Sequence, residues 1–485
     1  MNEVDQVEKD IWAGDLLDRK DEGLHLQRFI ENTFKLENGS NSPSSFVLNI
    51  NSGWGQGKTW FLTRLADQLR QNHAVVYFDA WRNDFTKDAL LSFVSIICDE
   101  LSRKFSTRKR VKSKVEKVKT VFSVVTKSAI PIATAVLAKQ LLGQQVDDLD
   151  LSDAQKEAFT DAADQLANVV SQSAVDAFVT QKNALEEFSS AISSLVDEIG
   201  KSQDLYLPIC IMVDELDRCR PTYAIELLES VKHLFAIRGI FFIVATDTKQ
   251  LSHSIKAVYG EGFDSISYLK RFFYAEFNLS RPDGMKLAES LFQGAVFVSR
   301  LYVSNSIRKN YGFDEIFTYF CDFFDLNVRD REQIFSILKT FVFSCEKPVD
   351  FIFIMLLICF KKCNSEKYER CKILRDVNPL DAYIGSLSGE RRSAELKLEY
   401  QRIDDYGGRY PLEDTKTKLS DVIFFYLRLF SNKGISGSHT AFLRESHYVY
   451  QKEIRERLLS ISTTYNDLES YFLLMDQAGR VSINS

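Results

Sequence analysis

The sequence predicts an α/β protein with three layers, in which helices cover both faces of a parallel sheet. Three short apolar runs support this fold: Phe46–Ile50, Ile209–Val213 and Ile240–Ala245. Unbroken apolar runs of this length are typical of parallel strands buried on both faces. Apolar residues at helical spacing follow the first run and precede the last, as the crossovers between parallel strands require.

The first of these strands leads into a glycine-rich turn and a helix, within SSFVLNINSGWGQGKTWFL at 44–62. Glycines let such a loop turn back and point N–H groups at phosphate oxygens, and the helix adds the positive end of its dipole. Lys58 would then reach the β- and γ-phosphates of a nucleoside triphosphate, and the Thr59 hydroxyl would bind Mg²⁺. The predicted nucleotide-binding residues are Gly53, Trp54, Gly55, Gln56, Gly57, Lys58, Thr59 and Trp60.

One position departs from the phosphate-loop pattern GxxxxGK[ST]. Ser52 stands where the first glycine belongs, and Gly53 follows it. The departure leaves the phosphate cradle plausible and puts its affinity in doubt. The structural alternative for this segment is a glycine-rich turn that enters a buried helix.

An acidic pair follows the second predicted strand, in DELDR at 214–218. Carboxylates at the carboxyl edge of a parallel sheet face the cleft in which nucleotides bind. We expect Asp214 to hold Mg²⁺ through its water shell and Glu215 to act as the general base for the attacking water. A solvated acidic turn is the alternative for this segment taken alone.

The next segment predicts a βαβ unit on the same sheet. Pro221 begins a helix, Gly239 ends the connection, and the strand Ile240–Ala245 follows. Thr246 and Asp247 come directly after it, level with Glu215, where one of them would sense the γ-phosphate or hold the water. An ordinary strand-end turn is an equal alternative for these two residues.

These residues carry a resemblance to a known family: the chain resembles KAP-type P-loop NTPases, a branch of the AAA-related STAND assemblage. The matching segments are GDLLDRKDEGLHLQRFI at 14–30, WGQGKT at 54–59, VVYFDAW at 75–81, DELDRC at 214–219, the strand ending ATD and YLKRFF at 268–273. The resemblance implies Mg²⁺-dependent ATP hydrolysis, oligomerisation and, in bacteria, frequent association with phage exclusion or defence. The expectation of ATP rather than GTP as the substrate rests on this resemblance, because no residue pattern indicates how the purine would be recognised.

More than a hundred residues separate the strand of FDAW from that of DELDR, which is far more than a crossover needs. We expect a helical insertion at 107–200, between core segments 1–106 and 201–285. It begins with a basic run at 103–119, which would bind anionic lipid, nucleic acid or the acidic stretch that follows, or would remain a solvated helix face. Within the segment 121–142, Lys127 and Lys139 bracket an apolar run that contains Pro131 and is too short for a bilayer span. We therefore rank a buried or oligomer-contacting helix first, a membrane-surface contact second and a true span third.

After Pro282 the chain is dense in Phe, Tyr and Leu, and helical packing is expected. We predict a lid-like helical domain at 286–378 and a mainly helical region at 379–485. Arg329, in NVRD, resembles the arginine by which AAA-related proteins sense nucleotide from a lid, with a solvent-exposed arginine as the alternative. The ten-residue run at 351–360 predicts a core helix rather than a membrane span, and GGRYPLED at 407–414 and SNKGISGSHT at 431–440 indicate loops.

Composition favours a large protein of two or three domains. The net charge of −6 gives little general attraction to nucleic acid. The eight cysteines form no CxxC pair and the histidines no cluster, which favours reduced structural thiols. The acidic, polar start argues against a secretory signal. We therefore expect a cytoplasmic protein, with peripheral association at the inner membrane as the alternative.

Phosphoryl transfer calls for more positive charge than Lys58 and Mg²⁺ supply, and an arginine from a neighbouring subunit is the usual source. Arg271, beyond the last expected core strand, is the leading candidate, with Lys270 beside it and Arg218 as the alternative. An ion pair that anchors the helix to the sheet is the structural alternative for Arg271. Three functions stay open: a defence ATPase with its effector on a partner protein, a nucleotide-binding signalling scaffold at the membrane with little turnover, and a nucleic-acid-stimulated ATPase.

Overall fold

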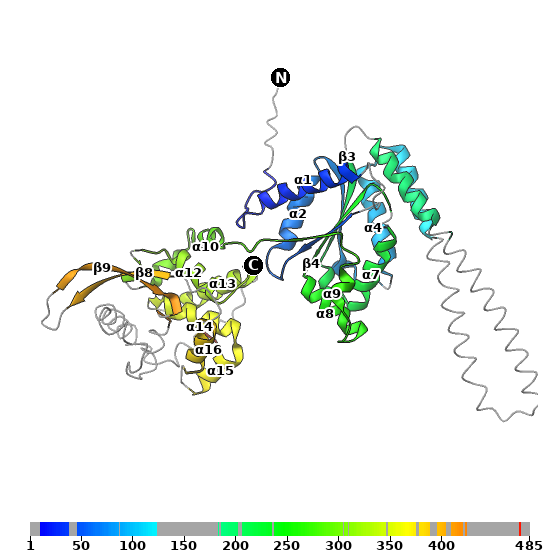
Figure 1. The fold of residues 1–485 in the computed structure, drawn as a ribbon. Helices are drawn as coiled ribbons and strands as arrows, with labels where there is room; N and C mark the ends of the chain where they lie inside the picture. The colour runs from blue at the N-terminus through cyan, green and yellow to red at the C-terminus, as the bar shows by residue number, and fades with distance from the viewer. Residues whose placement is uncertain are drawn as a thin grey trace, which may run out of the picture. The chain divides into compact units, whose positions relative to one another are not determined.

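A computed structural model describes residues 10–37, 46–123, 186–201, 206–374, 378–388, 395–403, 409–423 and 475–476, apart from positions 87, 235–236, 304, 309, 346–347 and 421, and also the isolated position 183. The chain divides into two compact units, Met1–Ser280 and Arg281–Ser485. Figure 1 shows the elements of both units, and each unit is described by itself.

The first unit is built on a five-stranded parallel sheet with strand order β2-β3-β4-β1-β5. The strands are β1 (Phe46–Asn51), β2 (His73–Asp79), β3 (Tyr206–Asp214), β4 (Ile240–Thr246) and β5 (Ala275–Asn278). The predicted α/β fold with a parallel sheet is confirmed. β5 was missed, because its four residues alternate between half-buried and exposed positions and form no apolar run.

Helices cover both faces of this sheet and complete the three layers (Figure 1). Side chains alternate along each strand, so Leu48 and Met212 point to one face while Val47 and Val213 point to the other. α1 (Lys20–Glu37) and α2 (Lys58–Leu69) pack on the first face. The second face holds α4 (Ala89–Lys104), α7 (Pro221–Leu234), α8 (Thr248–Tyr259), α9 (Ser265–Leu269) and the helical segments 109–123 and 186–200.

The two helical segments of the expected insertion flank residues 124–182, most of the expected insertion, which lie outside the described residues. Both segments belong to the hydrophobic core of the sheet's second face. Within the described ranges, every helix falls short of the length and apolarity that crossing a bilayer requires. The prediction of a helical insertion at 107–200 therefore stays a prediction for its central part.

The second unit is mostly helical in its first part. Its helices are α10 (Met285–Phe292), α11 (Asn305–Arg308), α12 (Phe313–Phe323), α13 (Val328–Ser344), α14 (Phe351–Cys363), α15 (Ser365–Leu374) and α16 (Asn378–Ser388), with the two-residue strands β6 (Leu301–Tyr302) and β7 (Val349–Asp350). Every residue of the run 351–360 is buried. The predicted core helix is therefore confirmed, because this run is apolar on every side and packs against α12, α13 and α15 in the core of the second unit.

An antiparallel hairpin follows, formed by β8 (Glu395–Ile403) and β9 (Arg409–Lys418). The prediction of a loop at 407–414 was wrong for its last six residues, which lie in β9. Apolar and polar residues alternate in ELKLEY at 395–400, with two glycines downstream between the strands. This period of two is the signal that predicts a hairpin. The predicted loop at 431–440 lies outside the described residues.

Candidate functional site

The phosphate loop joins β1 to α2, as predicted. Gly55 and Gly57 have positive φ angles of 75° and 83°, a backbone conformation that glycine adopts at little cost. A Cβ at Gly57 would stand 3.0 Å from Leu17 Cδ1. Ser52 is not among the residues with positive φ, and its N–H donates to the Thr246 carbonyl at 3.1 Å. The serine therefore fits this backbone, because the conformation there does not require glycine.

Lys58 begins α2, and its ammonium group lies back over the loop. Nζ donates to the carbonyl of Ser52 at 2.5 Å and to that of Gly53 at 3.3 Å. Burial lowers the pKa of Lys58, and nearby carboxylates oppose that shift, in decreasing order Asp217, Asp247, Asp214 and Glu215. The structure thus gathers around one ammonium the acidic residues that follow two different strands.

Asp214 ends β3 as a buried carboxylate, 1% exposed. Its Oδ2 accepts a hydrogen bond from the Tyr77 hydroxyl at 2.6 Å, and its Oδ1 accepts from the N–H of Glu215 at 2.8 Å. Burial raises the pKa of Asp214, while these hydrogen bonds act against the rise. Tyr77 was missed as a site residue. Its hydroxyl group among the apolar residues Val75, Val76 and Phe78, two residues before Asp79, is the signal that could have found it.

Glu215 adopts a left-handed conformation, with φ 61°. A non-glycine residue rarely occupies this region, and such residues concentrate at functional sites. Its Oε1 accepts from the Thr59 hydroxyl at 3.0 Å, and its Oε2 forms an ion pair with Arg218. Burial raises the pKa of Glu215, and the neighbouring Asp214 adds to the rise.

Two exposed tryptophans hold the turn after Glu215. The Trp54 indole N–H donates to the Asp217 carboxylate, and the Arg218 guanidinium lies over the Trp81 ring, 5.8 Å from its centroid. Trp54 comes from the phosphate loop and Trp81 from α3 (Ala80–Asn83), directly after β2. Arg218 is thus engaged within its own subunit.

Asp247 caps α8 at the end of β4. Its Oδ1 accepts from the N–H groups of Lys249 and Gln250, both at 3.1 Å. The strand-end alternative therefore describes part of its role, while its charge also acts on Lys58. Beside it, Asn49 accepts a hydrogen bond from Thr246 at 2.8 Å.

The segment before α1 contacts the phosphate loop through Arg19. The buried guanidinium of Arg19 forms an ion pair with Glu22 at 2.6 Å and donates to the Gln56 carbonyl at 3.3 Å. The Trp12 indole N–H donates to Gln68 of α2 at 2.7 Å. The N-terminal segment is therefore part of the loop's support. Neither Arg19 nor Trp12 was predicted as a site residue.

The residues present fit a magnesium ion. Mg²⁺ is usually held by one or two carboxylates together with substrate phosphates and water. Here the Thr59 hydroxyl and the Asp214 carboxylate, both hydrogen-bonded to Glu215, offer oxygen atoms of the kind that it prefers. Among the described residues no group of three His, Cys, Asp or Glu side chains forms a complete cage. A shared metal–phosphate site does not need such a cage.

Arg271 lies between α9 and β5, and its side chain is exposed. Within the described part of the chain, its guanidinium makes neither a hydrogen bond nor an ion pair. The alternative in which Arg271 anchors the helix to the sheet through an ion pair therefore finds no support. Its role as a finger stays a prediction.

Arg329 lies in the second unit, near the start of α13, and is exposed. The predicted helix start is confirmed, with Asn327 capping the N–H of Asp330 at 2.8 Å. Arg331, two residues further on, is the buried arginine, and it pairs with Asp322. The nucleotide-sensing role of Arg329 stays a prediction.

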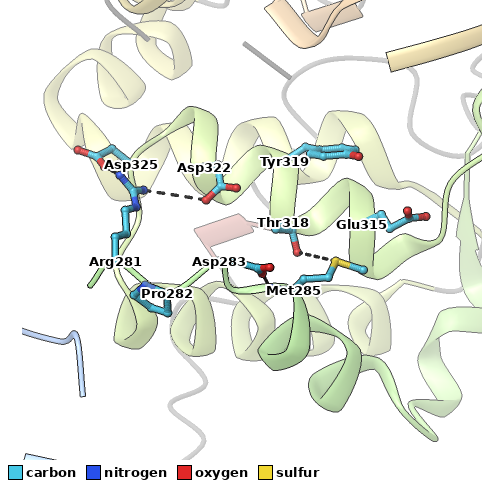
Figure 2. Close-up of a pocket in the computed structure, with 9 residues that line it drawn as sticks. All are labelled: Arg281, Pro282, Asp283, Met285, Glu315, Thr318, Tyr319, Asp322 and Asp325. Carbon is cyan, nitrogen blue, oxygen red and sulfur yellow. Dashed lines mark hydrogen bonds and ion pairs between the residues drawn. The ribbon is translucent and has the colours of Figure 1, made fainter. Parts of the chain in front are cut away.

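The second unit also contains an open cavity of about 800 Å³, shown in Figure 2. Its charged groups are already engaged: Arg281 pairs with Asp325, Asp283 accepts from the N–H of Met285, and Glu315 accepts from the N–H of Gly312. The remaining lining residues are Pro282, Met285, Thr318, Tyr319 and Asp322. Its carboxylates thus serve local structure.

Comparisons with known proteins bear on the family. The model described as "KAP family P-loop domain" matches residues 26–344. No curated protein matches the chain. Two solved structures are similar at low TM-scores. PCH-2 of C. elegans has a TM-score of 0.29 and 10% sequence identity, and the match covers 72% of this chain and 70% of PCH-2. The ORC2 protein of Aeropyrum pernix, in ADPNP–ADP complexes, has a TM-score of 0.31 and 12% sequence identity, and the match covers 88% of this chain and 84% of ORC2.

Proposed function

The chain belongs to the KAP family of P-loop domains, and from this premise we propose that it hydrolyses ATP in the presence of Mg²⁺. The observation that carries the proposal is the meeting of Lys58, Thr59, Asp214 and Glu215 at one edge of the sheet. A loop that only binds phosphate needs no carboxylate pair beside it.

The residues divide the work as follows. The ammonium of Lys58 leaves the Ser52 and Gly53 carbonyls for the β- and γ-phosphates. Thr59 and Asp214 would hold Mg²⁺, which would supply positive charge to the phosphate oxygens. Glu215 accepts a proton from the attacking water once one of its two partners, Thr59 or Arg218, gives way. Asp247 senses the γ-phosphate or holds the water, and Arg329 of the second unit senses the nucleotide.

Catalysis is completed in a homo-oligomer, in our proposal. Arg271 is supported as the arginine supplied to a neighbouring site, because it is exposed and unpaired within the described residues, whereas Arg218 is occupied by its own subunit's Glu215. ATP turnover then drives or gates the assembly of the oligomeric complex.

The biological setting proposed is an oligomeric anti-phage defence complex in the cytoplasm. The support is the family resemblance, together with the lack of any recognisable nuclease, protease or deaminase pattern in the sequence, which would put the effector on a partner protein. Expression of the chain with its neighbouring genes, followed by phage plaque counts, tests this. Equal plaque numbers with wild type and with Lys58→Ala would refute it.

A turnover assay tests the ATPase itself. ATP and GTP are supplied with Mg²⁺, with and without DNA, RNA and liposomes. Basal ATP turnover that Glu215→Gln removes supports the proposal. Nucleotide binding without turnover under every condition would favour the scaffold, and turnover only with nucleic acid would favour the stimulated ATPase. The exposed basic residues at 109–117 are the observation that favours a nucleic-acid-stimulated ATPase as the second candidate function.

A further inference from the structure

The helical segment 109–123 carries a concentrated positive charge in an acidic protein. Residues 103–119 include nine basic residues and one acid, although the whole chain has a net charge of −6. The structure shows which sides of this helix are available to a partner.

The apolar side of the helix is already used. Val111, Val115, Val118 and Phe122 are buried in the core of the sheet's second face. Phe122 packs against Phe188 of the helical segment 186–200, with 5.1 Å between ring centroids. Figure 1 shows these two helices side by side next to α4. The helix therefore has no apolar side left to insert into a bilayer.

Two of its cations are tied to the protein. Lys114 donates to the Ser194 hydroxyl at 2.6 Å, and Lys119 forms an ion pair with Asp99 at 2.8 Å. These two residues fix the helix and its neighbours in place. They are not available without breaking local contacts.

Four other cations are exposed and unpaired. The side chains of Lys109, Arg110, Lys112 and Lys117 make no hydrogen bond or ion pair with any described residue. At about 100° per residue, Lys109, Arg110 and Lys117 fall within an arc of about 100°, and at 1.5 Å per residue they span about 12 Å. Ser113 lies in the same arc, so the stripe presents cations and a hydroxyl group.

We propose that this stripe, Lys109, Arg110 and Lys117, binds the phosphate backbone of a nucleic acid. Duplex DNA carries one charge about every 1.7 Å of its axis, so a rigid stripe of about 12 Å faces several phosphates at once and gains from counterion release. Stable membrane binding by a surface helix needs buried apolar side chains or a second anchor. No large apolar side chain is exposed in the described residues 103–123 or 186–200. The chemistry therefore fits a phosphate polymer better than a lipid surface.

Binding of nucleic acid to this stripe needs no ATP hydrolysis. The inference rests on the proposed function only in one respect, namely that nucleic acid would then stimulate ATP turnover. Binding is therefore measured without nucleotide, and also with Lys58→Ala. If Lys58→Ala lacks ATP turnover and still binds DNA, the ATPase proposal and the DNA-binding proposal are tested separately.

The experiment uses the full chain and fluorescein-labelled DNA, single-stranded and duplex, of about 20 nucleotides, with anisotropy read between about 50 and 200 mM salt. The test variant is the triple change K109E/R110E/K117E. Its matched control, K35E/K339E/R370E, makes the same change in net charge at three other exposed positions. A second variant, K109Q/R110Q/K117Q, removes the charges without reversing them, and circular dichroism checks the helix content of each protein.

Wild type and control are expected to bind, with a slope of log K against log salt of about −2 to −3, for about three phosphates. Both helix variants should bind at least about tenfold more weakly and lose most of that slope. Equal binding by the helix variants and the control would overturn the proposal. Two further results would overturn it: wild-type protein that does not bind DNA but sediments with phosphatidylserine vesicles, and wild-type protein that binds neither DNA nor vesicles.

Discussion

The hydroxyl of Thr59 donates to Oε1 of Glu215 at 3.0 Å, although 156 residues separate the two in sequence. The bond connects the first residues of α2 with the turn that follows β3. It places the side chain expected on Mg²⁺ beside the side chain expected to activate water. The two motifs recognised separately in the sequence thus form one site.

Lys58→Ala and Glu215→Gln should separate binding from turnover. Lys58 neutralises phosphate charge in the ground state, so Lys58→Ala should abolish nucleotide binding. Glu215 acts on water as the reaction proceeds, so Glu215→Gln should keep binding and lose turnover on the order of 10²- to 10⁴-fold. Nucleotide titration and phosphate release measure the two effects. Equal loss of binding in both variants would refute these roles.

Arg271→Ala should keep ATP affinity and lose turnover on the order of 10³-fold, because the arginine would act on transition-state charge in a neighbouring site. Mixing Arg271→Ala with Glu215→Gln subunits should restore part of the turnover, since some interfaces then pair an intact finger with an intact base. Lys270→Ala is the control next to it. A protein that stays monomeric with ATP, and whose turnover per subunit is independent of its concentration, would contradict the shared site.

Gly57→Ala and Ser52→Gly should differ sharply. Alanine at position 57 must adopt a φ near 83° beside Leu17, and this should destabilise the loop by about 1–2 kcal/mol and weaken nucleotide binding. Ser52→Gly should change stability by less than about 1 kcal/mol, because Ser52 has no positive φ. Urea unfolding and nucleotide titration measure both. A gain in affinity above about tenfold for Ser52→Gly, worth about 1.4 kcal/mol, would show that the missing glycine limits the site.

Tyr77→Phe should destabilise the protein by about 1–3 kcal/mol, because it removes a donor from the buried Asp214 carboxylate. It should also raise the pKa of Asp214 further and weaken Mg²⁺-dependent nucleotide binding. Tyr223→Phe is the matched control: Tyr223 shares a neutral hydrogen bond with Ser92 at 3.1 Å, and its loss should cost about 1 kcal/mol without affecting the nucleotide. Equal effects of the two changes on nucleotide binding would show that Tyr77 has no special connection to the site.

Much of the first unit could be predicted from local pattern. The strands β1, β3 and β4 are runs of buried residues, and the glycine-rich loop and the acidic pair lie where each strand ends. β5 was missed because a four-residue edge strand carries no apolar run, whereas the β8–β9 hairpin was missed although the alternation at 395–400 indicates it. Arg19 was also missed, since a buried arginine held by Glu22 and a loop carbonyl has no signature in its neighbours.

The sequence by itself determined which residues can form strands and helices, and which short motifs carry phosphate-binding and carboxylate chemistry. These depend on residue types within a few positions of one another, such as Gly57 before Lys58 or Glu215 after Asp214. Only the tertiary structure decided that Tyr77 holds Asp214, that Trp54 holds Asp217, and that Ser52 needs no glycine backbone. It also decided which cations of the helix 109–123 are tied and which are free. Side chains far apart in the sequence meet only when parallel strands place their ends at one edge and helices bury one side, and no local pattern contains that register.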